Sequence, residues 1–192
     1  MHSNKLKTKD LVTIVLMSLL NIVIFGFGSF LYLTPITILL MPVFYSLLQG
    51  IVFFLLGVKV QKKGAILLYC IIQGVIGFNI PYILMFVLAG FLGEWFLQKL
   101  GYGTSKALTL SYVVMQVLAC FGSTIYPYAI TLQTTLANMH DTGDLGVHIQ
   151  AAGAMIQSWG SVVLVLVVIV SALLGALLGK VIVRKHLNGV RH

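Results

Sequence analysis

Long apolar runs that hold almost no charge constrain the fold of this 192-residue chain more than any other feature. The clearest run, residues 159–179, contains no charged side chain, and about 20 apolar residues suffice to cross the hydrocarbon core of a bilayer as a helix. Charged residues make up 8% of the chain, whereas a soluble domain carries about 25%. The composition therefore excludes a soluble enzyme, a disordered tail and a secreted disulfide scaffold, and it indicates an integral membrane protein.

Six runs are long enough to span a bilayer. They are continuously apolar rather than alternating, so they do not fit the strands of a membrane β-barrel. The first run is too long for the core of a signal peptide and lacks an obvious cleavage site, so we expect it to remain as a span. We predict an all-α, six-transmembrane-helix bundle forming a single membrane domain, 1–192, with spans at 11–33, 38–58, 64–80, 81–98, 107–127 and 159–179.

The basic residues predict the orientation of this bundle. All 12 Lys and Arg residues lie before the first span, between spans two and three, between spans four and five, or after span six. Cytoplasmic segments of membrane proteins retain Lys and Arg, so both termini are expected in the cytoplasm. The net charge of +8 is then a topology signal that suits anionic lipids of the bilayer, and we expect no nucleic-acid partner.

The outer side has one long connection, residues 128–158, which holds a predicted turn at 138–144 and a predicted helical piece at 147–157. Long connections in compact proteins are typical of binding loops and lids. We therefore place a small-molecule site beneath it, with Gln116 as its floor because a mid-bilayer carboxamide needs a partner. The candidate ligand-binding residues are Asn79, Tyr82, Gln116, Tyr126, Tyr128, Asn138, His140, Asp141 and Trp159. Any one of these residues is alternatively part of the interfacial aromatic belt or of helix packing.

Residues that carry catalysis are sparse. The sequence has no nucleophile, metalloprotease or phosphate-loop motif, so we predict no catalytic residues, no cofactor and no enzymatic activity. His140, Asp141, Asp144 and His148 lie close together, but their spacing matches no metal motif, so no metal site is predicted. Glu94 is interpreted as an interfacial carboxylate near Lys99, or alternatively as a coupling or gating residue.

Small residues recur at helical spacing in the first and last spans. Such strips let helix backbones approach closely in lipid. They serve either packing within the bundle or docking of a second membrane subunit. We predict partner docking for Ser18, Asn21, Ser171, Gly175 and Gly179.

Two sequence segments carry a resemblance to a known family. The run KLKTKDL (residues 5–11) precedes a Ser-containing first span, and GFLGE (residues 90–94) lies in the fourth. Together with six short spans and cytoplasmic termini, they resemble the substrate-binding S components of energy-coupling factor (ECF) transporters, in the group called Trep-Strep. One departure is that the family's docking Ala-xxx-Ala in the first helix is here MSLLNI (residues 17–22), where Ile22 replaces the second alanine. The strip in the last span is expected to take part of that role.

The resemblance implies a multi-pass protein of a bacterial-type cell membrane that binds a water-soluble vitamin or precursor. It also implies three partners, a transmembrane T component and two cytoplasmic ATPase subunits that supply the energy. The expected ligand is a hydroxymethylpyrimidine-, thiamine- or pyridoxine-like compound, because the outer site is neutral and aromatic. Two alternatives remain, a stand-alone secondary transporter of a small neutral solute and a non-catalytic membrane subunit.

Overall fold

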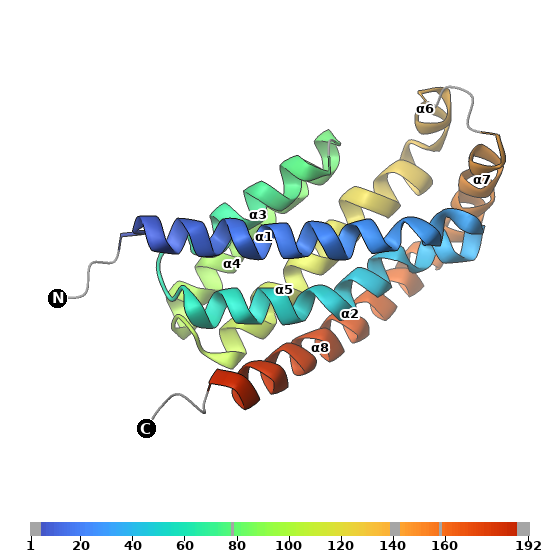
Figure 1. Cartoon of the computed structure of the whole chain (residues 1–192). Helices are drawn as coiled ribbons and strands as arrows, with labels where there is room; N and C mark the ends of the chain where they lie inside the picture. The colour runs from blue at the N-terminus through green and yellow to red at the C-terminus, as the bar shows by residue number, and fades with distance from the viewer. Residues whose placement is uncertain (1–4, 78, 139–142, 158, 188–192) are drawn as a thin grey trace.

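The structure is a computed structural model that describes residues 5–77, 79–138, 143–157 and 159–187. Every element in these ranges is helical, so the predicted all-α class is correct for the described chain (Figure 1). The elements are α1 (Thr8–Phe27), η1 (Gly28–Leu33), α2 (Pro35–Lys59), α3 (Ala65–Ile76), α4 (Ile80–Leu100), α5 (Ser105–Cys120), η2 (Phe121–Ile130), α6 (Leu132–Ala137), α7 (Asp144–Ile156) and α8 (Trp159–Leu187).

Five helical stretches in the described chain are long and apolar enough to cross a membrane: α1 with η1, α2, α4, α5 with η2, and α8. The third predicted span, 64–80, corresponds to α3, which is apolar but has only 12 residues. At 1.5 Å per residue α3 measures about 18 Å, less than the roughly 30 Å of a hydrocarbon core. The six-span count and the orientation of the termini therefore stay predictions.

The predicted outer connection 128–158 is more helical than expected: α7 (Asp144–Ile156) matches the predicted helical piece at 147–157, and further helical segments precede it. η2 continues α5 through Pro127, and α6 and α7 follow it. These elements lie at one end of the bundle, and the start of α1 and the end of α8 lie together at the opposite end (Figure 1). The described bundle thus has a helical cap at one end and the basic residues at the other.

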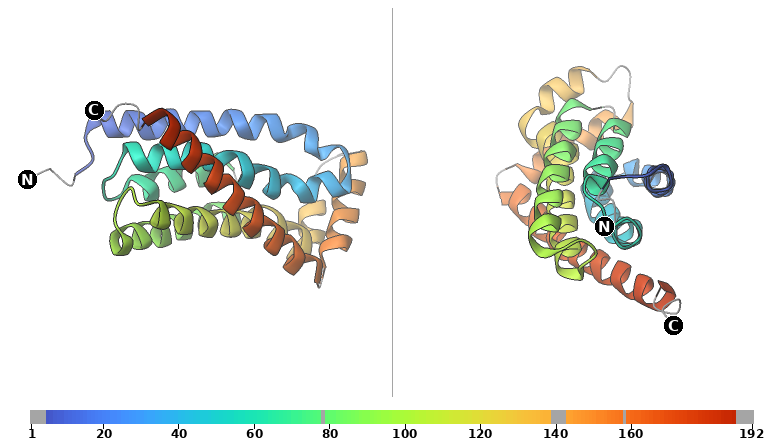
Figure 2. Two further views of the ribbon diagram at one scale, coloured as in Figure 1. Left: turned by 90° about the horizontal axis from the view of Figure 1, so that it is seen from below. Right: turned by 90° about the vertical axis from the view of Figure 1, so that its left-hand side faces the viewer.

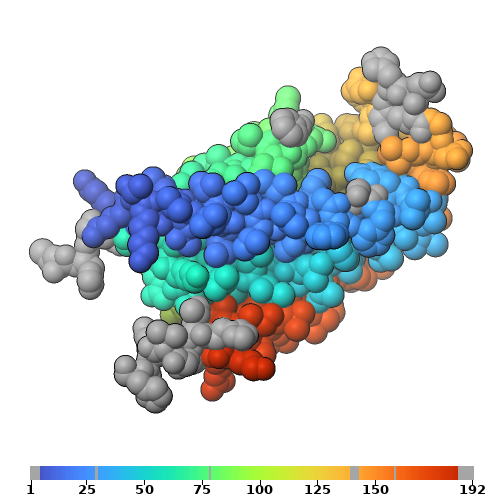
Figure 3. All heavy atoms as spheres, viewed as in Figure 1, coloured from blue at the N-terminus to red at the C-terminus, as the bar shows by residue number. Residues whose placement is uncertain are grey.

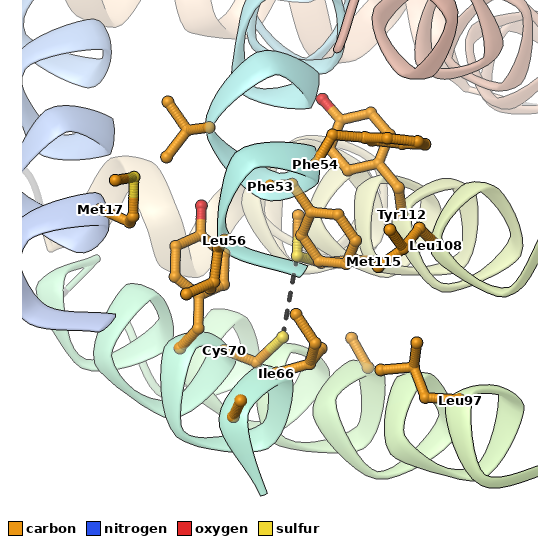
Figure 4. Close-up of a cluster of buried hydrophobic side chains, with 14 of the residues drawn as sticks. Met17, Phe53, Phe54, Leu56, Ile66, Cys70, Leu97, Leu108, Tyr112 and Met115 are labelled. Atoms are coloured by element: carbon orange, nitrogen blue, oxygen red, sulfur yellow. Dashed lines mark hydrogen bonds between the residues drawn. The ribbon is translucent and has the colours of Figure 1, made fainter. Parts of the chain in front are cut away.

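α2 is the central helix, and its largest contact is with α8, which crosses the bundle diagonally (Figure 2). α1 lies across one face, and much of its outer surface is exposed along its length (Figure 3). The main core lies between α2, α3, α4 and α5, where the rings of Phe53 and Tyr112 lie 5.2 Å apart and the Cys70 thiol donates to the Met115 sulfur at 3.7 Å (Figure 4).

The predicted docking strip on α8 lies inside the bundle, against α2. A Cβ atom built on Gly175 would lie 2.2 Å from the carbonyl oxygen of Ser46, and one on Gly179 would lie 2.5 Å from that of Gly50. Ser171 donates its hydroxyl to the Val43 carbonyl at 2.8 Å. The docking prediction for Ser171, Gly175 and Gly179 is therefore corrected, because their small side chains serve the α2–α8 crossing.

The two predicted docking residues on α1 are also internal. Ser18 and Asn21 are each 2% exposed. The Asn21 amide donates to Gln73 Oε1 at 3.0 Å, and the Gln73 amide donates to the Ser18 carbonyl at 3.3 Å. These bonds attach α1 to α3, since a buried amide in an apolar bundle must find a partner. They leave no free surface at these positions for a second subunit.

Side-specific labelling tests the predicted orientation. We expect Lys63→Cys and Lys106→Cys to react with a membrane-impermeant maleimide only after cells are opened, and Asp144→Cys to react on intact cells, because basic segments stay in the cytoplasm. The buried Cys70 and Cys120 provide an internal control for background reaction in the unsubstituted chain. Labelling of all three variants from one side would contradict the predicted topology.

Candidate functional site

An enclosed pocket, which we call the inner pocket, lies deep in the capped half of the bundle. It has a volume of about 80 Å³, well above the roughly 10–15 Å³ that a single water molecule needs. Helices α1, α2, α4 and α5 and segments η1 and η2 all contribute to it. Its lining residues are Phe25, Tyr32, Met41, Pro42, Tyr45, Gln49, Tyr82, Gln116, Ala119, Cys120, Ser123, Thr124 and Tyr128.

The polar groups of the inner pocket are neutral, and none of the described residues that line it is charged. Gln116 donates from its amide to Gln49 Oε1 at 3.0 Å, across the middle of α5 and α2. A carboxamide offers two donor hydrogens and an acceptor oxygen with two lone pairs, so each glutamine has capacity beyond this bond. The two glutamines therefore present both donor and acceptor groups to a ligand, and in its absence they are hydrogen-bonded to each other.

A wider cavity of about 310 Å³, the vestibule, adjoins the inner pocket. The two cavities share five residues, Phe25, Tyr32, Tyr82, Ser123 and Tyr128. Asn79 from the start of α4 and Leu145 and Ile149 from α7 complete the vestibule wall. The inner pocket therefore adjoins, through the vestibule, the end of the bundle that α7 covers.

The π-helical segment η2 positions part of the pocket wall. Pro127 has no N–H to donate, so an ordinary α-helical bond to the residue four positions earlier cannot form there. Wide turns of this kind are frequent at functional sites. Gly122 allows η2 to touch the start of α4, since a Cβ on it would lie 2.8 Å from the Tyr82 Cα. This contact places Ser123, Thr124 and Tyr128 around Tyr82.

Aromatic packing closes the side of the inner pocket next to α1. The rings of Tyr45 and Phe25 stack with centroids 5.1 Å apart, and the Tyr45 hydroxyl donates to the Phe25 carbonyl at 3.0 Å. Gly28 leaves room for the Tyr45 ring, because a Cβ there would clash with the hydroxyl. The pocket thus has stacking faces on one side and the glutamine pair on another.

The structure brings together only some of the predicted ligand-binding residues. Tyr82, Gln116 and Tyr128 line the inner pocket, and Asn79 lines the vestibule. Tyr126 and Asn138 instead line an open outer groove of about 640 Å³ between α4, η2 and α6. Trp159 is 81% exposed at the start of α8, so its predicted place in a pocket wall is wrong. His140 and Asp141 lie outside the described residues.

Five residues that bring amide or hydroxyl groups to the inner pocket were missed by the sequence interpretation. Gln49 carried a usable signal, because a carboxamide in the middle of an apolar run is as unusual as Gln116. Tyr45, Ser123 and Thr124 gave no such signal, since hydroxyl groups in apolar helices also bond to the helix's own backbone. Their assignment to the site depends on the helix rotations that tertiary packing sets. The missed residues are Tyr32, Tyr45, Gln49, Ser123 and Thr124.

Glu94 is buried rather than interfacial, which corrects the interpretation that places it beside Lys99. It is 5% exposed and accepts from the backbone N–H groups of Ile66 at 3.1 Å and Leu67 at 3.4 Å. These are first-turn donors of α3, whose N-cap is Gly64 with φ +88°, a residue without a capping side chain. The carboxylate of Glu94 therefore takes the place of an N-cap side chain for α3, and the positive end of the α3 dipole stabilises it there.

Tyr102, in the connection between α4 and α5, completes this capping site. Its hydroxyl donates to Glu94 Oε2 at 2.9 Å. Desolvation raises the pKa of Tyr102 to about 12, and the hydrogen bond to Glu94 acts in the same direction. The phenol therefore stays protonated, and remains a donor, throughout the physiological pH range.

Replacing Glu94 separates a capping role from a coupling role. We expect Glu94→Ala to lower the free energy of unfolding by about 2 kcal/mol, because buried N–H donors lose their acceptor. Glu94→Gln retains an acceptor oxygen and should cost less than half as much. Thermal unfolding in detergent measures both values. Normal stability of Glu94→Ala together with complete loss of solute uptake in Glu94→Gln would instead identify a coupling carboxylate.

The described residues bring no three His, Cys, Asp or Glu side chains together as a metal site would require.

The comparison with known families gives a direct match: the family described as a hypothetical bacterial integral membrane protein, Trep_Strep, matches residues 8–188. The chain belongs to the Trep_Strep family. No curated protein and no solved structure matches it. Membership of Trep_Strep, together with the apolar helices, shows that the chain is a membrane protein of a family described as bacterial.

Proposed function

We propose that this Trep_Strep protein is the substrate-binding S component of an ECF-type importer. The observation that carries the proposal is the inner pocket together with the adjoining vestibule, of about 80 and 310 Å³, which bring neutral hydrogen-bonding groups and aromatic faces together in the interior of an apolar bundle. Ligand sites in proteins have this character, with mostly apolar walls and a few converging polar groups. The layout of the chain, which resembles S components, adds independent support.

The proposed ligand is a small, neutral, ring-containing solute of the vitamin or vitamin-precursor class. The carboxamides of Gln49 and Gln116 offer a paired donor and acceptor, as ring nitrogens and hydroxyl groups require. Tyr32, Tyr82 and Tyr128 supply aromatic faces for a flat ring. A fully charged solute would leave its charge uncompensated in this pocket, which is costly.

The proposed energy source is external to the chain. A T component and two ATPase subunits would drive release of the ligand. The proposed docking surface for the T component is the exposed apolar face of α1, because α2 occupies the glycine strip of α8. Under this proposal the protein binds its ligand alone and transports it only in the complex. Accumulation against a gradient in vesicles that contain this protein alone would instead identify a secondary transporter.

Mass spectrometry of small molecules that co-purify with the detergent-extracted protein tests the proposed function. We expect a neutral heteroaromatic compound at near-stoichiometric amount. Calorimetric titration with hydroxymethylpyrimidine, pyridoxine and thiamine then ranks the candidate chemistries on protein freed of that compound, and thiamine should bind most weakly because its thiazolium ring carries a permanent positive charge. A protein that carries no compound, binds none of these three and is not stabilised against unfolding by any fraction of a cell extract would point to a non-catalytic structural subunit.

A further inference from the structure

A further cavity, which we call the basal pocket, opens at the end of the bundle that carries the basic residues. It has a volume of about 410 Å³ and lies between the C-terminal ends of α2 and α8 and the N-terminal end of α5. α2 and α8 cross closely at Gly50 and Gly179. Beyond that crossing the C-terminal part of α8 leaves the other helices (Figure 2), and the basal pocket occupies the space between them.

Three cations surround the basal pocket: Lys59 of α2 and Lys180 and Arg184 of α8. None of the described residues that line it is acidic. The described acids are occupied elsewhere or distant: Asp10 pairs with Lys62, Glu94 caps α3, and Asp144 starts α7 at the opposite end. Concentrated positive charge without a carboxylate raises the local affinity for an anion.

The start of α5 adds to this positive character. Ser105, the first residue of α5, lines the basal pocket, and Gln61 is held beside it by a hydrogen bond from its amide to the Val58 carbonyl at 3.0 Å. Thr104 caps one of the first N–H groups of α5, that of Ala107, at 3.4 Å, and the helix dipole favours an anion beside the remaining ones. Together with the three cations, this arrangement suits a phosphate group.

The other wall of the basal pocket is apolar. Val58, which is partly exposed, lines it together with the buried side chains of Phe54, Leu108 and Val183. A free phosphate ion would gain nothing from this wall, whereas a phospholipid places a phosphodiester and an acyl chain side by side. Basic pockets between transmembrane helices on the cytoplasmic side bind lipid headgroups in this manner.

We propose that the basal pocket binds one anionic phospholipid. Its phosphodiester lies among Lys59, Lys180, Arg184 and the start of α5, and an acyl chain lies along the apolar wall that includes Phe54. The bound lipid bridges α2, α5 and α8 at the point where α8 diverges. It therefore stabilises the C-terminal part of α8 against the bundle.

Lipid titration of the purified full-length protein in neutral detergent tests this proposal. Phosphatidylglycerol should raise the unfolding temperature with saturable dependence on its concentration, and phosphatidylcholine at equal concentration should not. The paired variant Lys180→Gln/Arg184→Gln should bind phosphatidylglycerol roughly 30-fold more weakly, because each cation near an anionic lipid contributes about 1 kcal/mol and 1.4 kcal/mol is tenfold. Native mass spectrometry should count one retained lipid on the unsubstituted chain.

The matched control is Lys63→Gln/Lys99→Gln, which removes the same charge at the same end of the bundle but outside the basal pocket. Equal loss of affinity in this control would show diffuse surface attraction and overturn the proposal. Inorganic phosphate forms a second arm. Stabilisation by inorganic phosphate equal to that by phosphatidylglycerol would assign the pocket to a free anion and overturn the lipid assignment.

Discussion

Gly175→Ala is expected to destabilise the bundle by about 3 kcal/mol or more, although alanine is normally the better helix former by about 1 kcal/mol. The Cβ of alanine at this position would lie 2.2 Å from the Ser46 carbonyl oxygen and 2.8 Å from that of Leu47. Both are backbone atoms, so no side-chain rotation relieves the clash and α8 must move away from α2. Loss of that contact also breaks the hydrogen bond from Ser171 to Val43. Thermal unfolding in detergent measures the effect.

Gly26→Ala is the matched control for this substitution. Gly26 lies in α1, and a Cβ built there meets nothing within 4 Å. The same change should therefore leave stability unchanged or raise it slightly through helix propensity. If Gly175→Ala is as stable as Gly26→Ala, and impairs only assembly with a partner, then the glycine strip is a docking surface and the α2–α8 packing is wrong.

Gln116→Leu is expected to weaken ligand binding about 30-fold or more, corresponding to about 2 kcal/mol. Leucine has a similar size but neither donates nor accepts, so a ligand polar group facing it would be desolvated without a partner. The substitution also leaves Gln49 Oε1 without the donor at 3.0 Å, which changes the orientation of the remaining carboxamide. Calorimetric titration with the compound recovered by mass spectrometry measures the loss.

Trp159→Ala and Gln150→Leu are the controls for the site. Trp159 is 81% exposed and Gln150 is exposed on α7, and neither lines the inner pocket. Both variants should bind within twofold of the unsubstituted protein. A large loss in Trp159→Ala with normal binding in Gln116→Leu would move the site to the outer surface, where the structure places Trp159.

The membrane class and the helical fold follow from the sequence, because a hydrocarbon solvent forces every backbone polar group to bond within its own segment. Apolar runs without charge, such as 159–179, therefore specify helices directly. α3 is helical as predicted, but it has 12 residues instead of the predicted 64–80, because its length depends on how the chain turns at its end. Within 128–158 the sequence predicted one helical piece, 147–157, which α7 matches, but it did not predict the end of η2 or α6.

The role of each polar or small residue was decided by tertiary structure. Gln116 and Gly175 each lie in an apolar run that forms a helix, but the sequence does not say which way either helix is rotated about its axis. Packing turned Gly175 toward the α2 backbone, Glu94 toward the start of α3, and Gln116 toward Gln49. The physical reason is that apolar surface in lipid specifies insertion without specifying neighbours, since association depends on close packing and specific hydrogen bonds. The sequence alone determined that the chain enters the membrane as helices, and only those contacts decided where the pocket lies.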